Sequence, residues 1–358
     1  MGTSRVDAKG RIADTLDVDA KLTPLQLDDF LPGAAGTLRG TLRLTGARNA
    51  PNIDADLTGS GLRYGEYRAD ALTAQGRLPW SSTARGGSLA IRAQGLNAGM
   101  AFDRLRVDAR GAVENLQLEG EAQGEIGRVA LSGSALRRGG NWNGTLQTLQ
   151  LDPAVGANWR LTAPARYAQN GANWTLTRSC FASSQGGSLC AQAQWPRSGL
   201  TLVGEGLPLS LTNPYLPEPE DGRRWRLSGT LALNAQVRPA GNAWAGRASV
   251  RSATGGLRLS ERARNDLIGY RGLALDAEFN PQRITATLNS GLSDGGRVDA
   301  RIATGWDAEL GLLDPAGERR SYPVRQLGYM EVARVIDSRA HGFQYRRTVQ
   351  AGRPAAST

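Results

Sequence analysis

The sequence predicts an all-β protein built as a long antiparallel meander. Apolar and polar side chains alternate with a period of two in several long runs, such as 37–46, 104–113 and 225–237. Glycine-rich turn signals separate the runs, for example Gly139-Gly140-Asn141 and Gly186-Gly187. Each strand is therefore expected to have one apolar face and one solvated face.

Helical spacing is rare in this chain. The best short candidates before residue 310 are Pro24 to Leu31, Pro208 to Leu216 and Arg262 to Ile268. Near the C-terminus, the loose spacing of apolar residues over 324–337 favours one further short helix.

An internal repeat and a change in composition divide the chain into three parts. The segment Pro24-Leu25-Gln26-Leu27 recurs as Pro208-Leu209-Ser210-Leu211, and each copy precedes a long strand. We expect a first β section over 1–206, which begins inside a larger protein, and a second over 207–306. Residues 307–358 form an atypical arginine-rich tail, for which a frameshifted or misjoined end and a poorly ordered natural tail are both open explanations.

The composition argues against an enzyme. The chain has 358 residues, a net charge of +10, one histidine and two cysteines. Zinc sites and acid–base sites usually draw on several such side chains, and no phosphate loop or nucleophile motif is present. We expect no catalytic residue, no metal and no cofactor.

Arginine supplies nearly all of the positive charge, with only two lysines in the chain, Lys9 and Lys21. Most of the arginines alternate with acidic or neutral polar residues along predicted strands, whereas a site for a polyanion would gather its charge. We therefore do not expect nucleic-acid binding.

The predicted apolar face is unusual because many of its positions are glycine or alanine. Either the opposite wall approaches closely, as in a narrow β-solenoid, or a ligand such as an acyl chain fills the space. On the second interpretation, the larger apolar residues would line a lipid groove: Leu38, Leu42, Leu44, Ile53, Leu57, Leu72, Leu89, Ile91, Leu105, Val107, Leu116, Leu118, Leu227, Leu231, Leu233, Leu273, Leu275, Ile284 and Leu288.

Two cysteines, Cys180 and Cys190, bracket a predicted hairpin turn at Gly186-Gly187. Pairing the strands about this turn places the two sulfur atoms opposite each other, which predicts a disulfide and an oxidising compartment such as the periplasm; two reduced thiols are the alternative. The same pairing puts the cysteines on the face of Gln192 and Gln194, which predicts a bulge.

No run of apolar residues reaches the length of a signal peptide or a membrane span.

The order of several motifs resembles the periplasmic β region of TamB-type translocation and assembly proteins, relatives of the AsmA-like proteins. The resemblance covers about residues 10 to 306 and rests on PNIDADLTGSGLRYGEYRADALTAQGRL at 51–78, the hairpin ending SLCAQAQW, and LPLSLTNPYLP followed by GTLALNAQV. It places the chain in the central to late part of that region.

This resemblance implies that the long antiparallel meander is curled into an open groove of the β-taco or β-solenoid kind. It also implies a periplasmic scaffold with an apolar groove, whose full-length relatives are anchored in the inner membrane of Gram-negative bacteria. It implies phospholipid transport between the two membranes, assembly of outer-membrane β-barrels and autotransporters, or both. The implied partners are phospholipid acyl chains and an outer-membrane barrel of the TamA type, reached through a region not found in this chain. The alternative is a closed β-solenoid surface protein, such as an adhesin or an autotransporter passenger.

Overall fold

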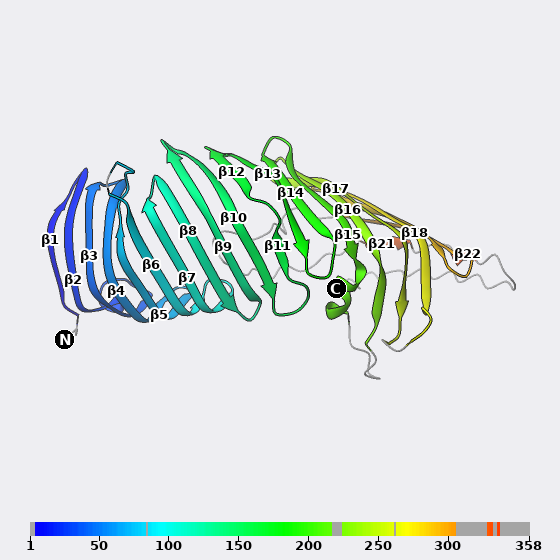
Figure 1. Ribbon diagram of the computed structural model, residues 1–358, viewed down its shortest axis with the longest axis horizontal. Helices are drawn as coiled ribbons and strands as arrows, with labels where there is room; N and C mark the ends of the chain where they lie inside the picture. The colour runs from blue at the N-terminus through cyan, green and yellow to red at the C-terminus, as the bar shows by residue number, and fades with distance from the viewer. Residues whose placement is uncertain are drawn as a thin grey trace, which may run out of the picture. The chain divides into compact units, whose positions relative to one another are not determined.

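The structure is a computed structural model that describes residues 4–83, 85–216, 224–260, 263–305, 328–331 and 335–336. Within these residues the chain forms antiparallel strands and two short 3₁₀ helices, so the predicted all-β meander is confirmed (Figure 1). The chain divides into two compact units, residues 1–172 and 173–358. The boundary predicted after residue 206 falls inside a strand, Gly199–Pro208, and stays a prediction.

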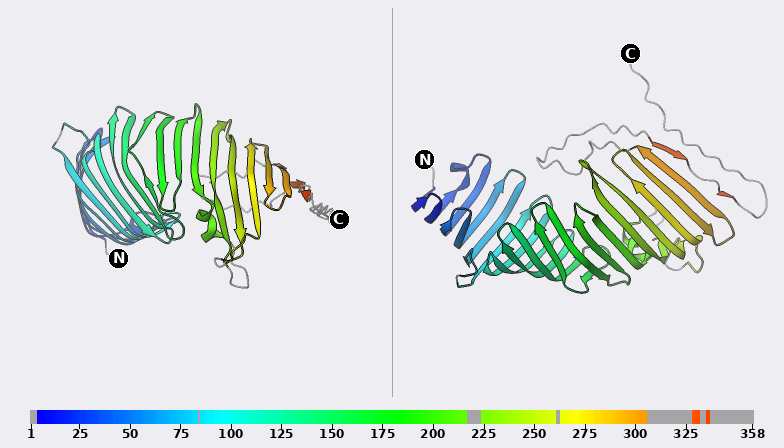
Figure 2. Two further views of the ribbon diagram at one scale, coloured as in Figure 1. Left: turned by 45° about the vertical axis from the view of Figure 1, so that its right-hand side comes forward. Right: turned by 90° about the horizontal axis from the view of Figure 1, so that it is seen from above.

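Unit 1 is a curved antiparallel sheet in which each strand from β1 to β10 pairs with the next along the chain (Figure 2). Its elements are β1 (Val6–Ile12), β2 (Thr15–Gln26), the 3₁₀ helix η1 (Leu27–Asp29), β3 (Ala34–Ala47), β4 (Ala50–Tyr64), β5 (Tyr67–Leu78), β6 (Gly87–Asn97), β7 (Ala101–Ala112), β8 (Asn115–Gly124), β9 (Gly127–Arg138), β10 (Asn141–Pro153), β11 (Trp159–Leu161) and β12 (Ala165–Asn170).

Unit 2 repeats the meander, from a cysteine-bearing hairpin through a series of long strands. Its elements are β13 (Asn173–Ser183), β14 (Ser188–Trp195), β15 (Gly199–Pro208), the 3₁₀ helix η2 (Leu209–Tyr215), β16 (Arg226–Ala240), β17 (Ala243–Arg258), β18 (Ile268–Phe279), β19 (Arg283–Leu292), β20 (Arg297–Gly305), β21 (Gly328–Glu331) and β22 (Val335–Ile336).

Around β8 the strand register pairs large apolar residues with small ones. Leu118 of β8 lies opposite Ala109 on one neighbour and Gly133 on the other. Gly120, the next residue of β8 on the same face, lies between Val107 and Leu131. Each leucine therefore finds room above the glycine or alanine beside it, and neighbouring strands stack without a clash.

The long strands of unit 2 are interrupted by β-bulges, and buried serines satisfy backbone groups there. The register shifts between Leu176 and Ser179, where the Ser179 hydroxyl, 2% exposed, donates to the Thr177 carbonyl at 2.7 Å. A bulged residue is left out of the ladder, so its neighbours need another partner.

The helix predictions had mixed outcomes. Short 3₁₀ helices form inside both proline-bounded repeat segments, at η1 and η2. The prediction for Arg262 to Ile268 was wrong: residues 263–267 are irregular and Ile268 begins β18. The C-terminal helix was also wrong, because the described residues within 324–337 form β21 and β22, which pair with β20.

A glycine in β3 tests how tightly the register is set. Gly40 has φ +122°, and a Cβ built there would lie 1.8 Å from the Asp56 carbonyl oxygen. We expect Gly40→Ala to lower the free energy of unfolding by about 1–3 kcal/mol, measured by urea denaturation. Gly120→Ala is the control, since its Cβ would meet Leu131 at 3.5 Å. Equal stability of the two variants would contradict this account.

Candidate functional site: the apolar face of the sheet

The apolar face of unit 1 follows from the register. Leu42 lies opposite Ala55, Ala55 opposite Gly76, and Gly76 opposite Leu89. Side chains directly opposite each other in an antiparallel sheet project from the same side. The alternating apolar residues of successive strands therefore form one continuous surface, which we call the apolar face of unit 1; the other side is its polar face.

The residues predicted to line a groove fall on the apolar faces of the two units. Twelve lie on unit 1, on strands β3 to β8, and seven on unit 2, where Leu233 leads through Val250 and Leu275 to Leu288 by direct pairing. The unit 1 set is Leu38, Leu42, Leu44, Ile53, Leu57, Leu72, Leu89, Ile91, Leu105, Val107, Leu116 and Leu118, and the unit 2 set is Leu227, Leu231, Leu233, Leu273, Leu275, Ile284 and Leu288.

All of these side chains are half-buried, and none is fully covered. Most of the buried apolar residues are alanines instead, such as Ala55 at 5% and Ala93 at 4% exposure. Leucines in an ordinary core would be buried, so no second layer of described residues packs over these faces. The leucines and valines stay accessible to a ligand.

An arginine held by two tryptophans marks one end of the apolar face of unit 1. Arg137 continues the apolar series of β9 and lies opposite Trp142 of β10. Its guanidinium carbon is 4.8 Å from the centre of the Trp80 ring and 5.7 Å from that of Trp142. Such cation–π contacts favour a charged guanidinium on an otherwise apolar surface.

Backbone hydrogen bonds explain how Trp80 reaches this arginine. The Glu114 amide donates to the Trp80 carbonyl at 3.0 Å, and the Arg137 amide donates to the Glu114 carbonyl at 2.9 Å. The Trp80 amide in turn donates to Asn52 Oδ1 at 2.8 Å. The segment after β5 is thereby fixed beside the turn between β7 and β8.

The apolar face of unit 2 also ends in tryptophans. Trp174 lies opposite Trp195, and the rings of Trp195 and Trp244 are 4.6 Å apart. Trp174 is 47% exposed and Trp244 46%. Both apolar faces thus have an aromatic border, with the amphipathic indoles near water.

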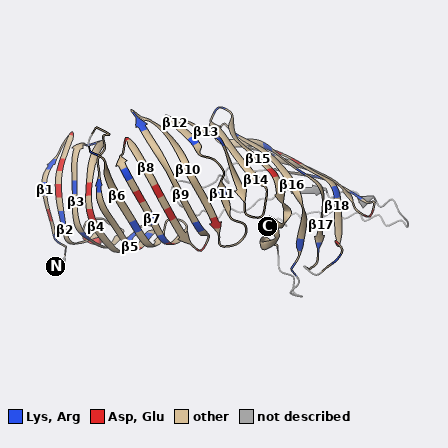
Figure 3. Ribbon diagram, viewed as in Figure 1, with Lys and Arg blue, Asp and Glu red and all other residues tan. Residues whose placement is uncertain are grey.

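The polar faces carry opposite charges in alternation rather than a uniform field (Figure 3). In unit 1, Asp108 accepts hydrogen bonds from Arg92 and Arg106, both at 2.7 Å. These bonds hold the pKa of the Asp108 carboxyl below its usual value. A bond from Arg128 lowers the pKa of Glu121 in the same way.

Each unit has a hollow in its sheet. The hollow in unit 1 has a volume of about 270 Å³ and is lined mostly by polar-face residues, among them Asp108 and Glu119. The hollow in unit 2, about 470 Å³, lies at the bulges and includes Leu231, Leu273 and Arg251. Of the leucine rows of unit 1, only Leu118 is among the residues that line the hollow in that unit.

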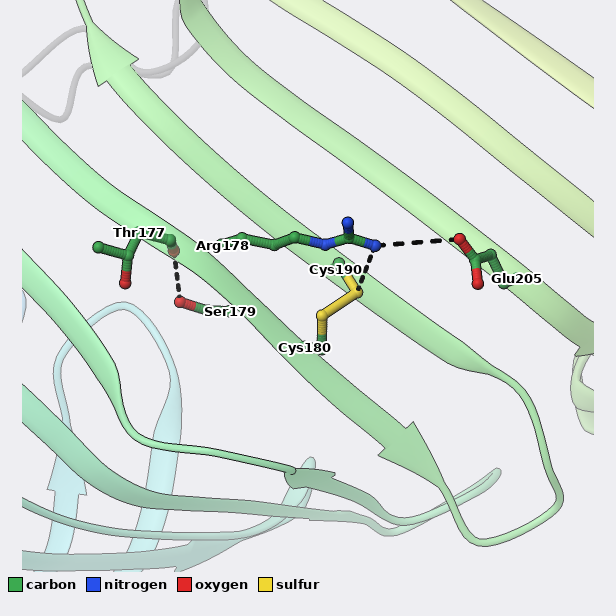
Figure 4. The surroundings of a disulfide bond; sticks show 6 residues. All are labelled: Thr177, Arg178, Ser179, Cys180, Cys190 and Glu205. Atoms are coloured by element: carbon green, nitrogen blue, oxygen red, sulfur yellow. Dashed lines mark hydrogen bonds and ion pairs between the residues drawn. A yellow bond between two sulfur atoms is a disulfide. The ribbon is translucent and has the colours of Figure 1, made fainter.

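The two cysteines are joined by a disulfide on the polar side of β13 and β14 (Figure 4). The register shift between Leu176 and Ser179 accounts for their position, because it lets Leu176 face Ala193 while Cys180 faces Cys190. The disulfide is therefore separate from the apolar face of unit 2. Arg178 lies beside it, 3.9 Å from Glu205.

Among the described residues, no group of three or more His, Cys, Asp or Glu side chains could hold a metal ion. The same part of the chain contains no helix that is both long and apolar enough to cross a membrane. Apart from β21 and β22, the tail predicted over 307–358, with its single histidine, lies outside the described residues.

The sequence prediction missed Arg137 and Trp80. A signal for the arginine was present, since Val129, Leu131, Gly133 and Ala135 alternate toward it and an arginine then occupies the next apolar position. No comparable signal marks Trp80, which follows the end of β5 and is positioned by hydrogen bonds to residues far along the chain.

Comparison with known proteins shows what kind of sheet this is. The family described as "TamB, N-terminal domain" matches residues 1–309. The chain belongs to this family. The matching part is named for the N-terminal domain, whereas the sequence resemblance placed it in the central to late region.

One curated relative is the translocation and assembly module subunit TamB of Haemophilus influenzae, 24% identical over 159 residues. The match covers 43% of this chain and 12% of the relative, so the chain spans only a small part of that protein's length. No solved structure matches the chain.

The pairing of Asp108 with two arginines predicts a pH-dependent contribution to stability. Because its pKa is lowered in the folded state, the contribution is present at neutral pH and is lost as the pH falls below the usual aspartate range near 4. We expect Asp108→Asn to lower the free energy of unfolding by about 1 kcal/mol at pH 7 and by almost nothing near pH 2. Urea denaturation at several pH values measures the difference; the same loss at every pH would contradict the prediction.

The disulfide joins two residues that lie ten positions apart in the sequence, so the loop that it closes is short. Replacing both Cys180 and Cys190 by serine should lower the free energy of unfolding by about 2–3 kcal/mol, because the unfolded chain gains freedom. Reduction of the wild-type protein should give the same loss and leave the serine variant unchanged. A serine variant as stable as the oxidised protein would rule out this role.

Proposed function

We propose that this chain is part of a TamB-like scaffold of the Gram-negative cell envelope and that its apolar faces carry phospholipid acyl chains between the inner and outer membranes. One observation carries the proposal: rows of leucine and valine continue in register over many strands, yet every predicted lining residue remains half-buried. A soluble protein rarely leaves so long a surface uncovered unless it binds something.

An acyl chain suits this surface physically. Each methylene that it buries contributes about 0.8 kcal/mol, so a chain lying along a few leucines gains several kcal/mol without a directional contact. A flexible hydrocarbon chain can lie across the half-buried leucines, whereas a rigid ligand would need a shaped pocket.

The periplasm is the proposed location, with an inner-membrane anchor in the full-length protein. The Cys180–Cys190 disulfide supports an oxidising compartment. The half-buried leucines count against the alternative of a closed β-solenoid, in which they would be sealed inside.

A second activity, assembly of outer-membrane β-barrels and autotransporters, is proposed on a separate ground. The Haemophilus influenzae relative is named as a subunit of a translocation and assembly module. The corresponding partner would be an outer-membrane barrel of the TamA type, bound by another region of the full-length protein. In neither role is a catalytic residue or cofactor proposed.

Adjacent residues on β8 offer a matched test. Leu118 lies on the apolar face and is half-buried, whereas Gln117 lies on the polar face and is exposed. A photoreactive amino acid placed at 118, in protein expressed in cells, should form adducts with phospholipid, detected by mass spectrometry after irradiation. The same group at 117 should form few or none.

Equal labelling at the two positions, or none at 118, would contradict lipid binding by the apolar face. Leu231, opposite Leu207 on the apolar face of unit 2, provides an independent repeat of the experiment.

A further inference from the structure

We propose that Arg137, clamped between Trp80 and Trp142, binds the phosphate group of a glycerophospholipid whose acyl chains lie on the apolar face of unit 1. This inference rests on the proposed lipid-carrying function and adds to it a place for the head group. The apolar face would then hold a lipid in one orientation, with its phosphate at the border formed by the two tryptophans.

The first argument is the missing counter-charge. Arg137 makes no ion pair and no side-chain hydrogen bond among the described residues, and its Nε is shut off from solvent without a partner. On the polar face, by contrast, Arg92, Arg106 and Arg128 all bond to carboxylates. The covered Nε is not open to a ligand, but the terminal Nη atoms also have no partner among the described residues, and a phosphate can accept hydrogen bonds from them.

Glu114, which is bonded to Arg137 through the backbone, forms no ion pair with the Arg137 side chain. Glu114 gives its carbonyl oxygen to the Arg137 amide, but its carboxylate accepts a hydrogen bond from the Ser82 amide at 3.2 Å. Because no described carboxylate forms an ion pair with Arg137, a bound anion would supply its counter-charge. The two indoles hold its guanidinium in place, which reduces the entropy lost when an anion binds.

The second argument is position. Arg137 follows Val129, Leu131 and Ala135 on the apolar side of β9, so a hydrocarbon surface begins directly beside the charge. From Val129 to Arg137 the strand extends about 26 Å at roughly 3.3 Å per residue. One leaflet of a bilayer core is about 15 Å thick, so an acyl chain that starts at Arg137 fits along the strand.

The third argument is chemical. Tryptophan favours the boundary between hydrocarbon and water, where the glycerol and phosphate of a lipid also lie. Trp80, Arg137 and Trp142 reproduce that boundary on one edge of an apolar surface. A phosphate is the one anionic group common to glycerophospholipids, and guanidinium forks bind it well.

The test compares two lipids with the same acyl chains, one with a phosphate-bearing head group and one without it. The full chain is titrated in detergent micelles with phosphatidylglycerol that carries a fluorescent acyl chain, and with diacylglycerol that carries the same chains. The wild-type protein should bind phosphatidylglycerol about tenfold more tightly. Arg137→Gln should abolish that difference and leave the affinity for diacylglycerol unchanged.

Arg138 provides the matched control, because it ends the same strand, carries the same charge and projects from the opposite side. Arg138→Gln should keep the preference for phosphatidylglycerol. An equal loss in both variants would attribute the preference to net charge and overturn the site. Arg137→Lys, which keeps a cation, should retain part of the preference for phosphatidylglycerol. Complete loss of the preference in this variant would mean that Arg137 has only a structural role and would overturn the proposal.

A measurement on the wild-type protein covers the case in which a variant fails to fold. Phospholipid with a photoreactive group on its head should label peptides containing Trp80 or Trp142, whereas label at the end of an acyl chain should fall farther along β8 and β9. Head-group adducts confined to the middle of the strands would overturn the proposal. If neither lipid binds at all, the proposed lipid-carrying function fails; if both bind equally, only the Arg137 site fails.

Discussion

The antiparallel register is the constraint on which the rest of this structure depends. The face from which a side chain projects is set by its position along the strand. A shift of the register by one residue would therefore move every leucine of that strand to the polar face. In the present register Leu118 lies opposite Ala109 and Gly133, with all three on the apolar face. The apolar face exists only while this pairing holds.

A sheet without a covering layer must find stability between neighbouring strands. Two arginines on the polar faces show how: Arg92 and Arg251 each donate to two backbone carbonyls and to an aspartate on the next strand. Exposed ion pairs contribute little one at a time. Guanidinium groups that join two backbones and a carboxylate restrain strand position as well, so they help to hold the register that the uncovered face requires.

The strands could be predicted from the sequence because their signal is local. A period of two identifies both the element and its faces, and the runs at 37–46 and 225–237 indeed lie in β3 and β16, apart from the first residue of the second run. The failures depended on distant partners. The helical spacing over 324–337 did not produce a helix, because the described residues there pair with β20 instead. Trp80 is connected to Arg137 through hydrogen bonds of the Glu114 backbone, and no local pattern in the sequence encodes that contact.

Composition left two explanations for the many small residues, a close opposite wall or a bound ligand, and the half-burial of the leucines supports the second, as we propose. In a narrow solenoid the leucines beside each glycine would be sealed by the facing wall, yet Leu118 and Leu131, next to Gly133 and Gly120, stay half-buried. Glycine costs conformational entropy in a strand, so its frequent use here needs a separate reason. Close backbone approach supplies one, since a Cβ at Gly40 or Gly76 would lie 1.8 Å or 2.0 Å from a carbonyl oxygen of the next strand.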